Sequence, residues 1–211
     1  MNNKKNPNER LLIFEKLTGI GAEHASKSLA AIVGQEVGIT ALENRILSPA
    51  NLYQHIGGVE ESFTMVVFRI DNVMNGFAIV AFPEPEGDKF VKLIRLMHAE
   101  KSDNIPNVEP GNKQPDYSKE SIIKETSNII VGSFLSAMHK RVKVNLIQSV
   151  PHIATDMIKS MLDEIIAEIS QVSENILVFE TELAIRPNDI RGRFFLLSDI
   201  ESANEILQNR V

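Results

Sequence analysis

The stretch SKESIIKETSNIIVGSFLSAM, from Ser118 to Met138, is typical of one α-helix with two unlike faces. At about 100° per residue, positions 121, 125, 128, 132 and 136 fall within roughly 80° of one another. All five residues there are polar or small: Ser121, Glu125, Asn128, Gly132 and Ser136. The other side carries apolar residues: Ile123, Ile130, Val131, Phe134 and Met138. The helix therefore has a core face without using the polar stripe, which is left open to a partner.

Three residues of the stripe also form a spaced pattern with a proline further along the chain. Three residues separate Ser121 from Glu125, two separate Glu125 from Asn128, and 22 separate Asn128 from Pro151. This spacing resembles the signature of the CheC, CheX and FliY phosphatases, which remove phosphate from the aspartate of the chemotaxis response regulator CheY. The segments NIIVGSFLSAM and NLIQSVPHI also resemble the second of the two motif copies found in CheC.

The resemblance implies a role for each motif residue. In that family the asparagine holds a water in line with the phosphoryl phosphorus, and the glutamate contacts a lysine of the response regulator. Asn128 would then position the water and Glu125 would dock the partner, with Ser121, Gly132 and Pro151 as further binding residues. The chemistry agrees, because an amide can both accept from and donate to a water, and phosphoryl transfer requires mainly positioning and charge stabilisation. Magnesium would arrive with the response regulator, so we expect no cofactor bound by this chain.

Each motif residue also has a plainer interpretation. Glu125 and Asn128 could belong to a solvated helix face, although asparagine in mid-helix costs roughly half a kcal/mol. Ser121 could cap the start of the helix, because serine suits that position. We expect Pro151 to end a strand and to form a wall of the site, with no catalytic role.

Composition limits the class of protein. With 211 residues and 43% hydrophobic content, the chain fits one domain over residues 1–211. Cysteine is absent, which excludes disulfides and thiolate metal sites. A net charge of -6, two tyrosines and no tryptophan argue against nucleic acid as a partner. No apolar run approaches the roughly 20 residues of a membrane helix, so we expect a cytoplasmic protein without a membrane partner.

The order of expected elements repeats along the chain. Residues 8–33 have a helical pattern, 36–42, 61–73 and 75–85 have strand patterns, and a helix follows at 88–98. After a stretch rich in Pro, Asn and Gly, helices are expected at 118–139, 154–170 and 200–208, and strands at 142–150, 174–187 and 190–199. We therefore predict an α+β fold with pseudo-twofold symmetry. Halves at about 8–99 and 118–208, joined by a linker at 100–117, would share one antiparallel-rich sheet with helices packed on it.

The first half has lost the motif. A shift of 109 residues pairs Ser121, Glu125, Asn128 and Pro151 with Leu12, Lys16, Gly19 and Leu42. Lysine inverts the charge of the docking glutamate, and glycine has no side chain to hold a water. We expect one working site per chain, whereas CheC proteins typically have two.

Other motifs carry little chemistry. Gly19 and Gly21 do not complete a nucleotide-binding fingerprint and favour close helix packing instead. Five histidines show no paired spacing for a metal, and no Gly-x-Ser-x-Gly elbow occurs.

Three functions remain open at this point. The first is an aspartyl-phosphate phosphatase acting on a phosphorylated CheY-like regulator in two-component signalling, with Asn128 and Glu125 as the active pair. The second is a non-catalytic adaptor that binds the receptor deamidase CheD or the phosphorylated regulator. The third is an unrelated α+β domain with a chance motif, which would show neither binding nor catalysis.

Overall fold

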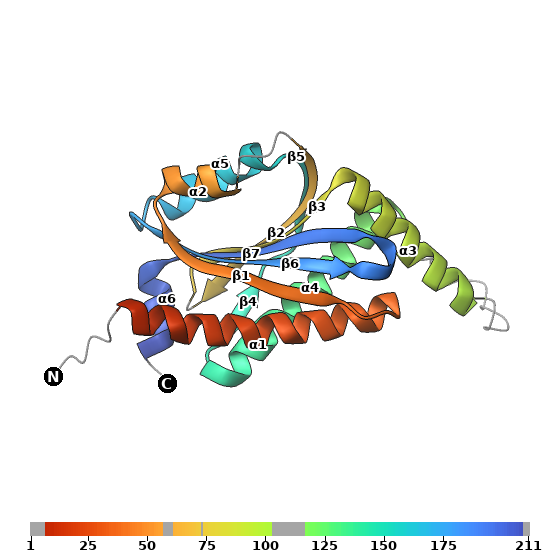
Figure 1. Ribbon diagram of the computed structural model, residues 1–211. Coiled ribbons are helices and arrows are strands. Elements are labelled where there is room, and N and C mark those ends of the chain that lie inside the picture. Colours follow the sequence, from red (N-terminus) through yellow and green to blue (C-terminus); the bar gives the residue numbers. More distant parts are fainter. Residues whose placement is uncertain (1–6, 57–60, 73, 103–116, 209–211) are drawn as a thin grey trace.

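The computed structural model describes residues 7–56, 61–72, 74–102 and 117–208. Two series of elements follow one another along the chain (Figure 1). The first consists of α1 (Pro7–Val33), β1 (Gly38–Leu47), α2 (Pro49–Ile56), β2 (Ser62–Asn72), β3 (Gly76–Pro83) and α3 (Glu84–Ser102). The second consists of α4 (Lys119–Val142), β4 (Leu146–Gln148), β5 (His152–Met157), α5 (Ile158–Ile169), β6 (Ile176–Ile185), β7 (Ile190–Asp199) and α6 (Ile200–Gln208).

The described strands form one antiparallel sheet in the order β1-β6-β7-β3-β2-β4, with β5 also paired to β2. A pseudo-twofold axis between β7 and β3 relates the halves: β7 matches β3, β6 matches β2, and β1 matches β4 with β5. The first strand of each half pairs with a strand of the other half. The predicted α+β fold class, with two halves sharing one sheet, is confirmed.

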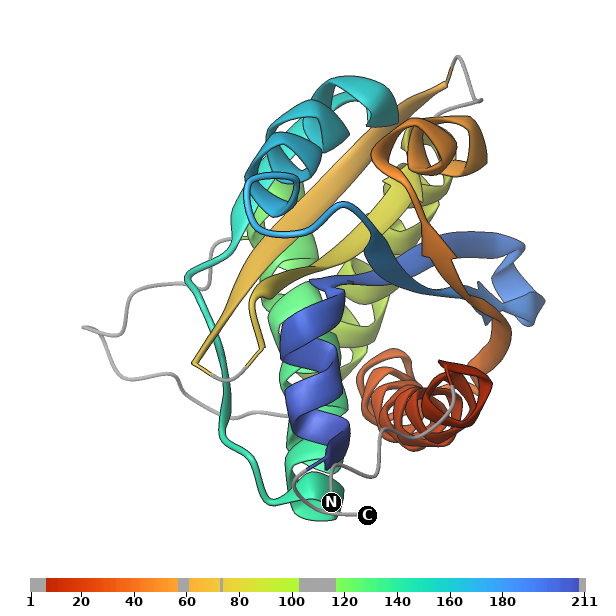
Figure 2. The ribbon, with the colours of Figure 1, turned by 90° about the vertical axis from the view of Figure 1, so that its left-hand side faces the viewer.

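The two faces of the sheet are covered unequally (Figures 1 and 2). Helices α1, α3, α4 and α6 pack on one face over a large core. Helices α2 and α5 cover the other face over a smaller core. The centre of the larger core is an aromatic cluster in which the Phe134 ring lies 4.7 Å from Phe194 and 5.7 Å from Phe179, between ring centroids. Aromatic burial of this kind stabilises a fold strongly, and it packs α4 against β6 and β7.

Both edge strands contain an extra residue at matching places. In β1, Ala41 opposes Thr181 and Glu43 opposes Glu180, so Leu42 has no partner of its own. On the other edge, Gln148 of β4 opposes Ile70 and His152 of β5 opposes Val67. Residues 149–151 therefore lie opposite only two residues of β2. Such bulges redirect the side chains that follow them.

Several element boundaries differ from the sequence expectations. The expected helix at 154–170 is wrong at its start, because 152–157 pair with β2 as strand β5. Helix α2 was not expected, and α3 extends beyond 88–98 in both directions. Residues 142–145, expected to be strand, lie at the end of α4 and in the turn after it. The expected linker at 100–117 falls mostly outside the described residues.

Candidate functional site

A groove of about 870 Å³ runs along α4, with α3 and the end of α1 as its other walls. Ser121, Glu125, Asn128 and Pro151 all line it. Helical periodicity brings the first three together, because residues three and four apart lie on one face. Pro151 comes from the sheet edge. The structure thus places all four positions of the sequence pattern in one concave site.

The start of α4 is fixed by a helix cap and by ion pairs to α3. Ser118 is the N-cap, and its Oγ accepts from the backbone N–H of Ser121 at 3.2 Å. Ser121 itself is therefore not the cap, which corrects that interpretation. Lys119 Nζ donates to Asp88 Oδ1 at 2.7 Å and lies 3.5 Å from Glu84 Oε1. These ion pairs tie α4 to the first turns of α3.

Lys119 and Asp88 shift each other's ionisation. The hydrogen bond from Lys119 lowers the pKa of the Asp88 carboxyl, and the same bond raises the pKa of the Lys119 ammonium. Both shifts favour the charged forms. The pair therefore stays ionised at neutral pH.

Glu125 and Asn128 differ in their surroundings. Glu125 is exposed, so its carboxylate is available to a cation on a docking protein. Asn128 is half-buried, and its Oδ1 accepts from Gln148 Nε2 of β4 at 2.6 Å. Gln148 was not among the residues singled out from the sequence. No local signal identifies it, because its contact with α4 depends on the pairing of β4 with β2.

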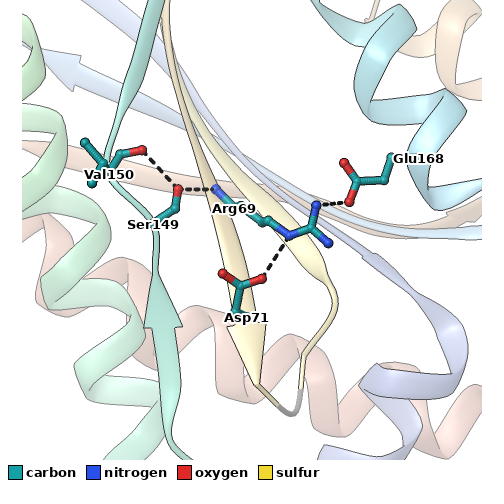
Figure 3. Close-up of polar contacts among 5 residues, drawn as sticks. All are labelled: Arg69, Asp71, Ser149, Val150 and Glu168. Atoms are coloured by element: carbon teal, nitrogen blue, oxygen red, sulfur yellow. Dashed lines mark hydrogen bonds and ion pairs between the residues drawn. The ribbon is translucent and has the colours of Figure 1, made fainter.

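Pro151 reaches the groove because of the bulge between β4 and β5. Figure 3 shows how the bulge is held. Ser149 Oγ accepts from the backbone N–H of Arg69 at 3.0 Å and donates to the carbonyl of Val150 at 3.0 Å. The backbone N–H of Ser149 also donates to the Arg69 carbonyl at 2.8 Å. Proline suits this place, since a bulge on an edge strand needs no donor from it.

Gly132 lies one turn beyond Asn128 on the same face of α4. It is not in the groove lining. A Cβ at this position would meet the Gln148 amide, at 3.7 Å from Oε1 and 3.8 Å from Nε2. The structure therefore places Gly132 against the residue that contacts Asn128.

The first-half counterparts have a different environment. Leu12 is exposed on α1, Lys16 is also exposed, and a Cβ on Gly19 would meet nothing within 4 Å. Leu42 is the extra residue of β1, but its side chain lies outside the described ones. None of the four lines the α4 groove, so the two halves are not equivalent at these positions.

A second groove, of about 380 Å³, lies on the other face of the sheet between β2, β5 and α5. Its polar lining includes Arg69, whose guanidinium pairs with Glu168 of α5 and, through Nε, with Asp71 Oδ1 at 2.9 Å (Figure 3). None of the motif residues Ser121, Glu125, Asn128 and Pro151 lines this second groove. Ser149 and Val150, which belong to the bulge, do line it.

The described residues contain no group of three or more His, Asp or Glu side chains placed to hold a metal ion. Within the same part of the chain, no helix has both the length and the apolar content to cross a bilayer.

The chain is similar in sequence and in structure to known proteins. No model of a known protein family matches the chain. The CheY-P phosphatase CheC of Bacillus subtilis is 24% identical over 200 residues, which are 94% of this chain and 92% of CheC. FliY of Thermotoga maritima superposes with a TM-score of 0.70 at 14% identity, covering 98% of this chain and 97% of that one. The FliM middle domain from H. pylori superposes with a TM-score of 0.62 at 12% identity, covering 97% of this chain and 99% of that one, and a chain of the FliG–FliM complex from H. pylori gives 0.56 at 14% identity.

These likenesses extend over nearly the whole chain and include both halves of the fold. Together with the motif on α4, they confirm the resemblance that the spacing indicated: the chain is similar to CheC over nearly its whole length and has the same fold as FliY.

Proposed function

We propose that this protein is a cytoplasmic phosphatase that hydrolyses the aspartyl phosphate of a CheY-like response regulator. One observation carries the proposal: Glu125 and Asn128, at the motif spacing, open into one groove together with Ser121 and Pro151. The likeness to CheC, whose name states this activity, supports it.

The site needs only to position reactants. Glu125 is exposed and would pair with a cation on the regulator, which brings the phosphorylated aspartate to the groove. Asn128 would hold a water in line with the phosphorus. As the water oxygen bonds to phosphorus, the bond to the aspartate oxygen breaks. The products are the free aspartate carboxylate and inorganic phosphate, which carries both water protons as H₂PO₄⁻ and can then release one to solvent. Magnesium would come with the regulator.

The test uses purified protein and the phosphorylated CheY-type regulators of the source organism. We expect faster phosphate release from at least one regulator. Asn128→Ala should reduce the stimulated rate about a hundredfold, because removing a well-placed positioning group costs about 3 kcal/mol. Ser136→Ala is the matched control, since Ser136 is exposed on the same helix face outside the groove. An unstimulated rate with every regulator, or full activity in Asn128→Ala, would contradict the proposal.

A non-catalytic role is the second candidate. FliM, solved in a complex with FliG, has the same fold. The changed first-half positions, Leu12, Lys16 and Gly19, also leave an α1 surface available for another partner, CheD among them. In the same assay, a stable complex with phosphorylated regulator at an unaltered rate of phosphate loss would favour an adaptor.

A further inference from the structure

The Gln148 side chain bridges two oxygens of Asn128. Its Nε2 lies 2.6 Å from Asn128 Oδ1 and 3.5 Å from the Asn128 backbone carbonyl oxygen. A backbone carbonyl can only accept, so the NH₂ end of Gln148 must face α4. Asn128 Oδ1 is then the acceptor. This leaves Asn128 Nδ2 and the second lone pair of Oδ1 for a water in the groove.

The bulge determines that Gln148 faces α4. Gln148 opposes Ile70, a residue of the larger core on the α4 side of the sheet. His152 opposes Val67, which packs on the α5 side. In a regular strand, residues 148 and 152 would share a face. The extra residue between them lets Gln148 point to Asn128 while β5 keeps its own register.

Gly132 supplies the space beside the Gln148 amide. A methyl group there would reach only ordinary van der Waals contact with Gln148, at 3.7 Å. A longer side chain on this face of the helix would occupy the volume of the amide. Gln148 Oε1 is buried without a hydrogen-bond partner among the described residues. An unpaired buried amide oxygen destabilises a fold, so packing alone gives no reason for a glutamine here.

We propose that Gln148 is a positioning residue that fixes the side-chain amide of Asn128, and that Gly132 keeps the space Gln148 needs. The inference rests on the proposed function, in which Asn128 holds the attacking water. Gln148 acts through Asn128 and touches neither the phosphoryl group nor the regulator. Losing an orienting partner of a reacting group commonly costs ten- to hundredfold in rate.

The kinetic experiment compares Gln148→Met with the wild type on the regulator that the wild type dephosphorylates. Methionine has a similar length but no donor. We expect kcat about tenfold lower with KM unchanged and an unchanged melting temperature. Gly132→Leu should give the same defect by displacing the amide from the other side. Ile147→Met is the control on the same strand, because Ile147 is exposed.

The double variant, Gly132→Leu with Gln148→Met, tests whether the two substitutions remove the same hydrogen bond. If Gly132→Leu and Gln148→Met both act by removing one hydrogen bond, the double variant should be no slower than either single variant. Multiplied defects, a raised KM, or an unchanged kcat in Gln148→Met would overturn the inference while leaving the proposed function intact.

A measurement without activity tests the contact itself. In NMR, the side-chain amide protons of Gln148 should exchange with solvent at least tenfold more slowly than those of exposed Gln171. Asn128→Ala should remove most of that protection. Equal exchange rates in the wild type would overturn the inference. Protected Gln148 protons in a protein that dephosphorylates no regulator would instead count against the proposed function alone.

Discussion

Gly21 of α1 lies so close to the ring of Phe134 on α4 that an added Cβ would be 2.7 Å from Phe134 Cδ2. Real Cβ atoms do not approach other atoms so closely. The two helices therefore touch through a glycine at this level. The same α1 forms one wall of the α4 groove further along, through Ala31 and Ile32. The packing of Gly21 against Phe134 thus helps to set the shape of the site.

Gly21→Ala should lower the free energy of unfolding by about 1–3 kcal/mol, because overpacking a core forces neighbours to move. The matched control is Gly19→Ala on the same helix, where a Cβ meets open space. That variant should be neutral or stabilising by up to about 1 kcal/mol, since alanine favours a helix. Urea unfolding measures both. Equal effects at the two positions would contradict the close contact.

Reversing the charge of the exposed carboxylate, with Glu125→Lys, should weaken binding of the regulator about ten- to hundredfold. The effect should be largest at low ionic strength, because salt screens exposed charges. Binding is measured by titrating the regulator in its beryllofluoride-activated form at two salt concentrations. Lys124→Glu, at the neighbouring groove position, serves as the comparison. A loss of affinity that does not depend on salt would argue against a docking role for the charge.

One regulator should bind per chain. The four motif residues that line the groove belong to the second half alone, and Lys16 and Gly19 replace the glutamate and asparagine in the first. Calorimetric titration with activated regulator should give a stoichiometry of about one, and Lys16→Ala should leave both affinity and rate within about twofold. Two binding events per chain would show that the α1 surface also takes the regulator.

Stability should depend on pH through the contact of Lys119 with Asp88. The Asp88 pKa is lowered in the folded state by the hydrogen bond from Lys119. Its contribution is therefore present above the unfolded pKa and is lost as pH falls through the folded value. The Lys119 pKa is raised, so its contribution is present below the unfolded pKa and is lost as pH rises through the folded value.

The effect is small because Asp88 is mostly exposed: its side chain retains 59% of its accessible surface. Asp88→Asn and Lys119→Met should each cost less than about 1 kcal/mol near neutral pH. The difference from wild type should shrink below pH 4. Thermal unfolding across pH, combined in a double-mutant cycle, measures the interaction. A difference that stays constant down to pH 2 would show that packing, and not charge, connects the helices.

Local pattern predicted most elements but not the edge of the sheet. Strands β2, β3, β6 and β7 follow from runs of β-branched and aromatic residues. The segment HIATDM, residues 152–157, has no such run, and all six of its side chains are exposed or half-buried. It becomes a strand only because β2 offers it hydrogen-bonding partners. Helix α2 was not predicted, because its eight residues are too few to show a clear helical repeat of apolar residues.

The sequence by itself determined the order of side chains on α4. Helical geometry ties Ser121, Glu125 and Asn128 to one face whatever surrounds them. Tertiary structure decided what meets that face. Pro151 and Gln148 reach the groove through a bulge on a strand that pairs with the other half of the chain. Such pairing joins residues far apart in sequence, and a shift by one residue would turn Gln148 away from Asn128. No pattern within a single segment encodes that register.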